Sequence, residues 1–221
     1  MNDKNNAMLL WQLISPTLPI GAYAWSGGME YAVEAGWIKN EAEAANWIQG
    51  QIRQGFSNLE VPMFCRLYDA WQAQDLTAVN NWNCQLLAMR ESAELQQQDM
   101  ALAAALLKVL PMLNVAEPAR RSKKCFSCVF AYATQQLGIE KVAAAQGLVW
   151  SWCENQVVAA IKLVPLGQSS GQRILSGSMP IIAAAVERGQ HCEDQDIGML
   201  MPGVAIASAL HETQYSRLFR S

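Results

Sequence analysis

Apolar residues recur every three or four positions along most of this chain, and this period predicts helices. The pattern is clear between residues 44 and 52 and again between residues 61 and 71. Residues at this spacing share one face of an α-helix, whereas a strand requires alternation of apolar and polar residues. The sequence has no clean alternation and no Asn-Gly or Asp-Gly hairpin turn. We therefore predict an all-α fold, a single-domain bundle of roughly ten helices.

Prolines, glycines and capping residues mark where the predicted helices begin and end. We expect a helix from Asn40 towards Gly55, with Asn40 as its N-cap and Glu43 as the capping-box partner. Asp75 is expected to cap another helix, and a short one should end at Gly36. The remaining helices are expected over residues 7–14, 58–74, 92–110, 125–137, 140–164, 172–188 and 197–210, the last of them kinked at Pro202.

The segment 111–124 interrupts this pattern with two prolines. It also carries a basic cluster: Arg120, Arg121, Lys123 and Lys124. We expect an exposed loop whose charges are solvated, although contact with an acidic partner is an alternative. The two sides of this loop show no separate core patterns. Residues 1–221 are therefore expected to form one domain that ends in a C-terminal tail at 211–221.

The stretch from Pro19 to Glu30 is unusual for a helical protein, because it holds three glycines and two aromatic residues. Glycine lowers helix stability by about 1 kcal/mol relative to alanine, so Gly27 and Gly28 require another role. We expect a backbone or a partner to approach this turn closely. Glu30 and Glu34 then follow as like charges one helical turn apart. They lie either on a solvated helix face or in an acidic patch for a cationic partner or a metal ion.

Two further charged positions are open to interpretation. Lys162 is an isolated cation near the end of an apolar helical stretch. Its ammonium group either extends from an apolar surface into water or is presented to a partner. Arg90 and Glu94 are four residues apart, and we expect them to form a weak surface ion pair.

Composition favours a protein that binds other proteins. Hydrophobic residues make up 52% of the chain and charged residues 16%, where about 25% charged residues is typical. Part of such an apolar exterior is expected to be buried against partners. The net charge of −3 does not suggest nucleic-acid binding. No uncharged apolar run reaches the ~18 residues that a membrane span needs.

The six cysteines lie mostly in apolar helical patterns, so we expect a reducing cytoplasm. We expect no cleaved signal peptide, because Asp3 offsets the charge of Lys4 and Gln12 interrupts the short apolar run Ala7–Ile14. Cys125 and Cys128 form a Cys-x-x-Cys pair, for which buried core thiols are the favoured interpretation and a metal or redox site the alternative. The two histidines, His191 and His211, do not form a helix-borne metal pair, and the sequence lacks a phosphate-binding loop. We therefore predict no catalytic residue and no metal-binding residue.

Four segments occur in an order that resembles one known family. They are Pro19–Glu30, Arg90–Glu94, Ile161–Gln168 and the tail His211–Ser221. In combination they are similar to segments of the UreF family of urease accessory proteins, and the similarity covers nearly the whole chain. Gly27 and Met29 depart from the common family pattern, and 111–124 matches nothing specific to it.

The resemblance implies a non-enzymatic helper in the maturation of nickel urease. UreF-like proteins are all-α and form homodimers. They bind the accessory protein UreD (UreH in some bacteria), and this complex recruits the GTPase UreG to the urease apoprotein. GTP hydrolysis by UreG is coupled to nickel delivery, and UreF-like proteins have been proposed to regulate that GTPase. The resemblance therefore implies no tightly bound cofactor in this chain, because the complex handles nickel and UreG binds GTP.

Matching motifs also imply roles for individual residues. A surface facing UreG would contain Tyr23, Glu30, Glu34 and Lys162. Contact with UreD, or support of the dimer, would come from the tail residues Tyr215, Arg217 and Arg220. Two other classes of function remain open from the residues alone. One is an α-helical enzyme that uses Glu30, Glu34 or Glu94 as acid-base groups; the other is a metal-binding chaperone built on the Cys-x-x-Cys pair and His191.

Overall fold

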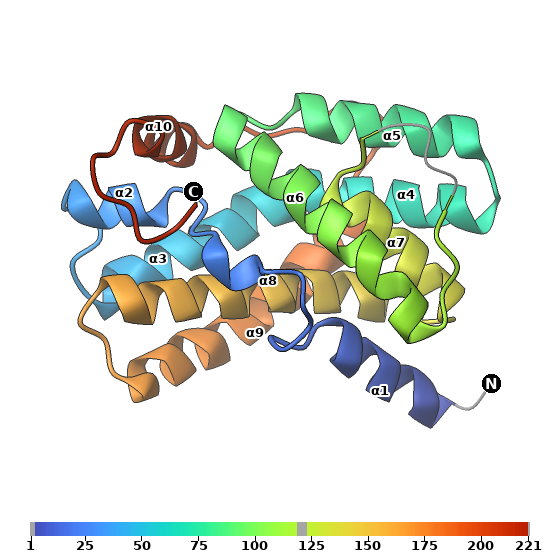
Figure 1. Ribbon diagram of the computed structural model, residues 1–221, viewed down its shortest axis with the longest axis horizontal. Helices are drawn as coiled ribbons and strands as arrows, with labels where there is room; N and C mark the ends of the chain where they lie inside the picture. The colour runs from blue at the N-terminus through green and yellow to red at the C-terminus, as the bar shows by residue number, and fades with distance from the viewer. Residues whose placement is uncertain (1–2, 119–122, 221) are drawn as a thin grey trace.

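The computed structural model describes residues 3–118 and 123–220, which form helices joined by loops (Figure 1). Ten α-helices lie in this part of the chain: α1 (Asp3–Leu13), α2 (Met29–Glu34), α3 (Glu41–Gln51), α4 (Val61–Gln72), α5 (Leu76–Ala88), α6 (Ala93–Val109), α7 (Phe126–Gln136), α8 (Lys141–Leu163), α9 (Gln168–Gln190) and α10 (Pro202–His211). The shorter helical segments are η1 (Ala22–Ala24), η2 (Ile52–Glu60), η3 (Leu110–Leu113) and η4 (Asp194–Asp196). These residues contain no strand, so the predicted all-α bundle is confirmed.

The core of the bundle is organised around α4, which contacts α5, α7, α8 and α9. The long helices α8 and α9 pack against each other along one side (Figure 1). Phe64 of α4 and Phe130 of α7 are buried at the centre, with their ring centroids 6.1 Å apart. Burying each such side chain contributes about 1.5–3 kcal/mol. Helices α2, α6 and α10 pack onto this core and carry the site described below.

Helices α3 and α4 are the two ends of one continuous helical rod, joined by the π-helix η2. The prediction that a helix ends near Gly55 is therefore wrong. Gly55 lies inside η2, and a Cβ atom there would be 3.0 Å from the Cε atom of Met201 and 3.3 Å from the Sδ atom of Met199. The glycine permits close packing of the 199–201 segment on the rod and does not end the helix.

The predicted helix caps are confirmed. The Oδ1 atom of Asn40 accepts a hydrogen bond from the backbone N–H of Glu43 at 3.0 Å, and Asp75 accepts two from the first turn of α5. The Glu43 carboxylate accepts from the N–H of Lys39 at 2.7 Å, one residue before the position that a capping box would use. Gly36, with a φ of +74°, follows the end of α2 as expected.

Two predictions about the later part of the chain need correction. The segment 111–124 is only partly exposed, since Leu113, Val115 and Lys124 are buried; Arg120 and Arg121 lie outside the described residues. The last helix begins at Pro202 and is not kinked there, because proline at the first helical position leaves no intrahelical hydrogen bond unmade.

None of the helices that the structure describes combines the length and the apolar character needed to cross a lipid bilayer.

Candidate functional site

The last helix, α10, packs against the turn before α2. Gly28 is the N-cap of α2 and has a φ of +82°. A Cβ atom at this position would lie 2.9 Å from the backbone nitrogen of Ser208 in α10. The predicted close approach to the glycine pair is therefore confirmed, and the neighbour is the backbone of the chain's own last helix. Any side chain at Gly28 would push α10 away.

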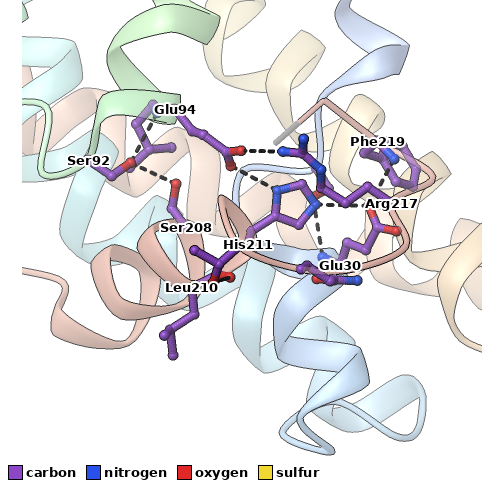
Figure 2. A network of polar contacts seen from close by, with 12 residues as sticks. Glu30, Ser92, Glu94, Ser208, Leu210, His211, Arg217 and Phe219 are labelled. Atoms are coloured by element: carbon purple, nitrogen blue, oxygen red, sulfur yellow. Dashed lines mark hydrogen bonds and ion pairs between the residues drawn. The ribbon is translucent and has the colours of Figure 1, made fainter.

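Beyond α10 the tail turns back over the N-terminal segment, and its backbone is fixed at three consecutive residues (Figures 1 and 2). The N–H of Leu218 donates to Oε1 of Glu30 at 2.6 Å, and the N–H of Phe219 donates to Oε2 at 2.8 Å. The N–H of Arg220 donates to the carbonyl oxygen of Ala24 at 2.8 Å. The side chain of Phe219 is buried beneath the tail. Glu30 thus holds the tail by its backbone.

His211, the last residue of α10, lies between two carboxylates (Figure 2). Its Nδ1 atom is 2.8 Å from Oε2 of Glu94, and its Nε2 atom is 3.1 Å from Oε2 of Glu30. Arg217 of the tail donates to Oε1 of Glu94 at 3.0 Å. We refer to Glu30, Glu94, His211 and Arg217 as the tail clasp, because they join α2, α6, α10 and the tail.

Each ring nitrogen of His211 shares a hydrogen bond with one carboxyl group of the tail clasp. An ionised carboxylate only accepts hydrogen bonds, so a contact with one uses a ring N–H as the donor. The imidazole is fully buried, and Glu30 and Glu94 are 7% and 6% exposed. Removing one of these three side chains leaves buried polar groups without a partner, which is far more costly than loss of a surface pair.

These contacts correct two expectations. Glu30 does not lie on a solvated helix face; it is buried, whereas Glu34 is exposed one turn further along α2. Arg90 does not pair with Glu94. Its guanidinium donates to both oxygens of Glu60, at 2.8 and 3.1 Å, and to Asp99 at 2.8 Å. A short-range helical rule predicted the pair, but tertiary packing supplied closer partners to both residues.

A cavity of about 190 Å³ lies beside the ion cluster of Glu60, Arg90 and Asp99, between α1, η2, α6 and α8. Burial acts to raise the pKa of Glu60, but the nearby charge of Arg90 outweighs it and holds that pKa below its ordinary value. At Asp99 burial prevails and raises the pKa. The carboxylates proposed for an enzyme do not line this cavity: Glu30 and Glu94 belong to the tail clasp, and Glu34 lies on the surface.

The structure brings some members of the two predicted sets of partner-binding residues close to the tail. The Nζ atom of Lys162 lies 5.9 Å from the ring centroid of Tyr23 and 5.6 Å from that of Phe219 in the tail. Arg220 lies over the ring of Trp25 at 5.9 Å. We use the name tail face for five exposed residues on the tail and beside it, namely Tyr23, Lys162, Tyr215, Leu218 and Arg220. Contact of these residues with partners stays a prediction.

The thiols of the Cys-x-x-Cys pair lie in the core, as favoured from the sequence. Cys125 is the N-cap of α7 and Cys128 follows in its first turn, and neither is exposed. Burial raises the pKa of the Cys125 thiol well above its ordinary value, which opposes formation of a metal-binding thiolate. Within residues 3–118 and 123–220, no three histidine, cysteine or acidic side chains are grouped so that they could hold a metal ion.

His211 is the residue of this site that the sequence interpretation missed. A usable signal was present, because Val204, Ala207, Ser208 and His211 follow one another at helical spacing. All four are buried. A histidine on the apolar face of a helix must find hydrogen-bond partners inside the protein. What the sequence could not supply was the identity of those partners, which lie on α2 and α6.

Comparison with known proteins agrees with this architecture. The family model for UreF matches residues 38–179. The urease accessory protein UreF of Alkalilimnicola ehrlichii is 47% identical over 215 residues, which cover 96% of this chain and 94% of that protein. Those of Chromohalobacter salexigens and Marinobacter nauticus are 42% and 43% identical, each over 96% of this chain and 93% of the relative. A helical bundle with these relatives is a urease accessory protein. The chain belongs to the UreF family.

Proposed function

We propose that this protein is a scaffold of a urease maturation complex. It binds UreD (UreH in some bacteria), forms a homodimer in that complex, and recruits the GTPase UreG to the urease apoprotein. GTP hydrolysis by UreG is then coupled to insertion of nickel into the urease active site. In this role the chain catalyses no reaction itself, and nickel and GTP are handled by the complex and by UreG.

The tail face is the observation that carries this proposal. It combines three large exposed side chains, Tyr23, Tyr215 and Leu218, with the cations Lys162 and Arg220. Tyrosine and arginine are enriched in protein interfaces, and exposed cations favour partners with acidic surfaces. Because the tail and the Tyr23 region touch, UreD and UreG would bind next to each other. A scaffold that brings a GTPase to its target requires such adjacent sites.

The reducing cytoplasm is the proposed location. All six cysteines, including the exposed Cys84, are free thiols. Free thiols of this number persist where glutathione and thioredoxin keep cysteines reduced.

Assembly of the purified proteins tests the proposal. Size-exclusion chromatography with light scattering would be performed on the chain alone, with UreD, and with UreD, UreG and GTP. The expected result is a stepwise gain in mass, first to a complex with two copies each of this chain and UreD, and then to one that also carries UreG. A chain that stays monomeric in both mixtures would contradict the scaffold function.

Regulation of the GTPase is tested separately. The rate of GTP hydrolysis by UreG would be measured alone, with UreD, and with UreD and this chain. A change in rate that requires this chain would support coupling of hydrolysis to the scaffold. If the complex assembles but the rate of GTP hydrolysis does not change, the chain does not regulate UreG, and only the scaffold function remains.

A further inference from the structure

Two buried residues of the tail clasp have no exposed surface with which to touch a partner. His211 is fully buried and Glu94 is 6% exposed. The tail face, in contrast, is made of exposed side chains on the tail and beside it. Any effect of these two residues on partner binding must therefore pass through the position of the tail.

The contacts explain how such an effect would arise. Oε2 of Glu30 lies 3.1 Å from Nε2 of His211 and accepts from the N–H of Phe219, while Oε1 accepts from the N–H of Leu218. The His211 ring thus keeps the Glu30 carboxylate directed at the tail backbone. Without His211, the carboxylates of Glu30 and Glu94 would face each other across the vacated space, and their repulsion would turn Glu30 away from the tail.

Glu94 acts from the opposite side of the imidazole. One of its oxygens orients His211 and the other holds Arg217. The N-terminus of α6 is also tied to α10, because the hydroxyl oxygens of Ser92 and Ser208 lie 2.7 Å apart. The position of α6 therefore affects the position of the tail through Glu94 and His211, which are both buried.

We propose that His211 and Glu94 are positioning residues for partner binding: they hold the tail in the one arrangement in which the tail face is complete. The effect on partner binding rests on the proposed scaffold function, whereas the positioning of the tail is a property of the chain alone. The tail would detach when the clasp is broken, while the helical core, which does not depend on the tail backbone, would remain folded.

Hydrogen exchange of backbone amides tests the positioning without any partner. The N–H groups of Leu218, Phe219 and Arg220 are the tail's own anchors, so their protection reports tail docking directly. We expect His211→Ala and Glu94→Gln each to lower protection at these amides by at least about tenfold more than they lower it in α4. His211→Gln, which keeps one N–H donor group, should fall between His211→Ala and the unmodified chain.

His191→Ala is the matched control, because His191 is the chain's other histidine and its side chain is 70% exposed. It should leave the tail amides protected. Unchanged protection of the tail in both His211→Ala and Glu94→Gln would overturn the inference. Equal loss of protection in the tail and in α4 would also overturn it, since the clasp would then serve only overall stability.

Binding to UreD and UreG supplies the second measurement. The variants with a detached tail are expected to bind the partners at least about tenfold more weakly. A detached tail with full partner binding would overturn the role in binding. If the unmodified chain, with a docked tail, binds neither partner, the scaffold function fails while the exchange result still stands.

Discussion

The Nε2 atom of His211 lies 3.1 Å from the Oε2 atom of Glu30, although 181 residues separate the two side chains in the sequence. This contact joins the last helix of the chain to its second helix. Glu30 also binds the backbone of the tail, so the stretch around Pro19–Glu30 and the tail behave as one structural unit. Substitutions in either segment should therefore disturb both.

Gly28 is the first place to test this unit. In Gly28→Ala the new methyl group would meet the backbone nitrogen of Ser208, which cannot move without shifting α10. We expect the free energy of unfolding to fall by about 2 kcal/mol or more. Gly21→Ala is the matched control, because Gly21 also has a positive φ, +72°, but has no neighbour within 4 Å of a Cβ atom.

Urea unfolding of the two glycine variants separates backbone strain from displacement of the helix. Gly21→Ala carries only the strain, about 1–2 kcal/mol. Equal losses of unfolding free energy in the two variants would mean that α10 does not pack closely against Gly28.

Glu30 and Glu34 are expected to differ sharply in their effect on stability. Glu30→Gln removes a buried charge that faces His211 and two backbone N–H groups, and we expect a loss of about 3–5 kcal/mol. Glu34→Gln changes an exposed side chain and should alter stability by less than about 0.5 kcal/mol. Denaturant unfolding of both variants is the measurement. Similar small changes in the two would show that Glu30 is solvated.

The helices of this protein could be predicted from its sequence because their causes are local. The spacing of apolar residues located most of the helices. Asn40 and Asp75 marked two helix starts, because each side chain accepts a hydrogen bond from the backbone of the first helical turn. The π-helix was missed since Gly55 alone does not distinguish a helix end from a site of close packing. Local signals fail where the deciding neighbour lies far away in the chain.

The candidate site was predicted in part. Tyr23, Lys162 and Arg220 were selected from the resemblance, and the structure places them together at the tail. The tail clasp was not predicted, because the partners of His211 lie 117 and 181 residues earlier in the chain. Helical spacing alone paired Glu94 with Arg90, and only the fold shows that each has a buried partner elsewhere.

The pair between Glu41 and Arg173 should give the bundle a measurable response to acid. Arg173 donates to both oxygens of Glu41, at 2.8 and 2.6 Å, and so links α9 to α3. This hydrogen bonding lowers the pKa of Glu41 from 4.5 to about 2. Since the folded-state pKa is the lower one, the contribution of the pair is complete above pH 4.5 and is lost as the pH falls towards 2.

Carboxyl chemical shifts followed by NMR across this range would report the titration of Glu41. In Arg173→Gln the midpoint should return towards 4.5. A midpoint near 4.5 in the unmodified protein would mean that the pair does not persist in solution.

Lys162 should matter for partner binding and little for stability. Its ammonium group lies beside the rings of Tyr23 and Phe219, contacts that are worth about 0.5–1 kcal/mol at an exposed site. Lys162→Ala should therefore keep its folding midpoint nearly unchanged but weaken assembly with UreD and UreG by about tenfold, because the proposed interface would lose a cation that faces an acidic partner. Lys108→Ala, which removes another exposed lysine from the last turn of α6, is the control and should assemble normally. Normal assembly of Lys162→Ala as well would show that Lys162 is not one of the residues that supply the binding energy.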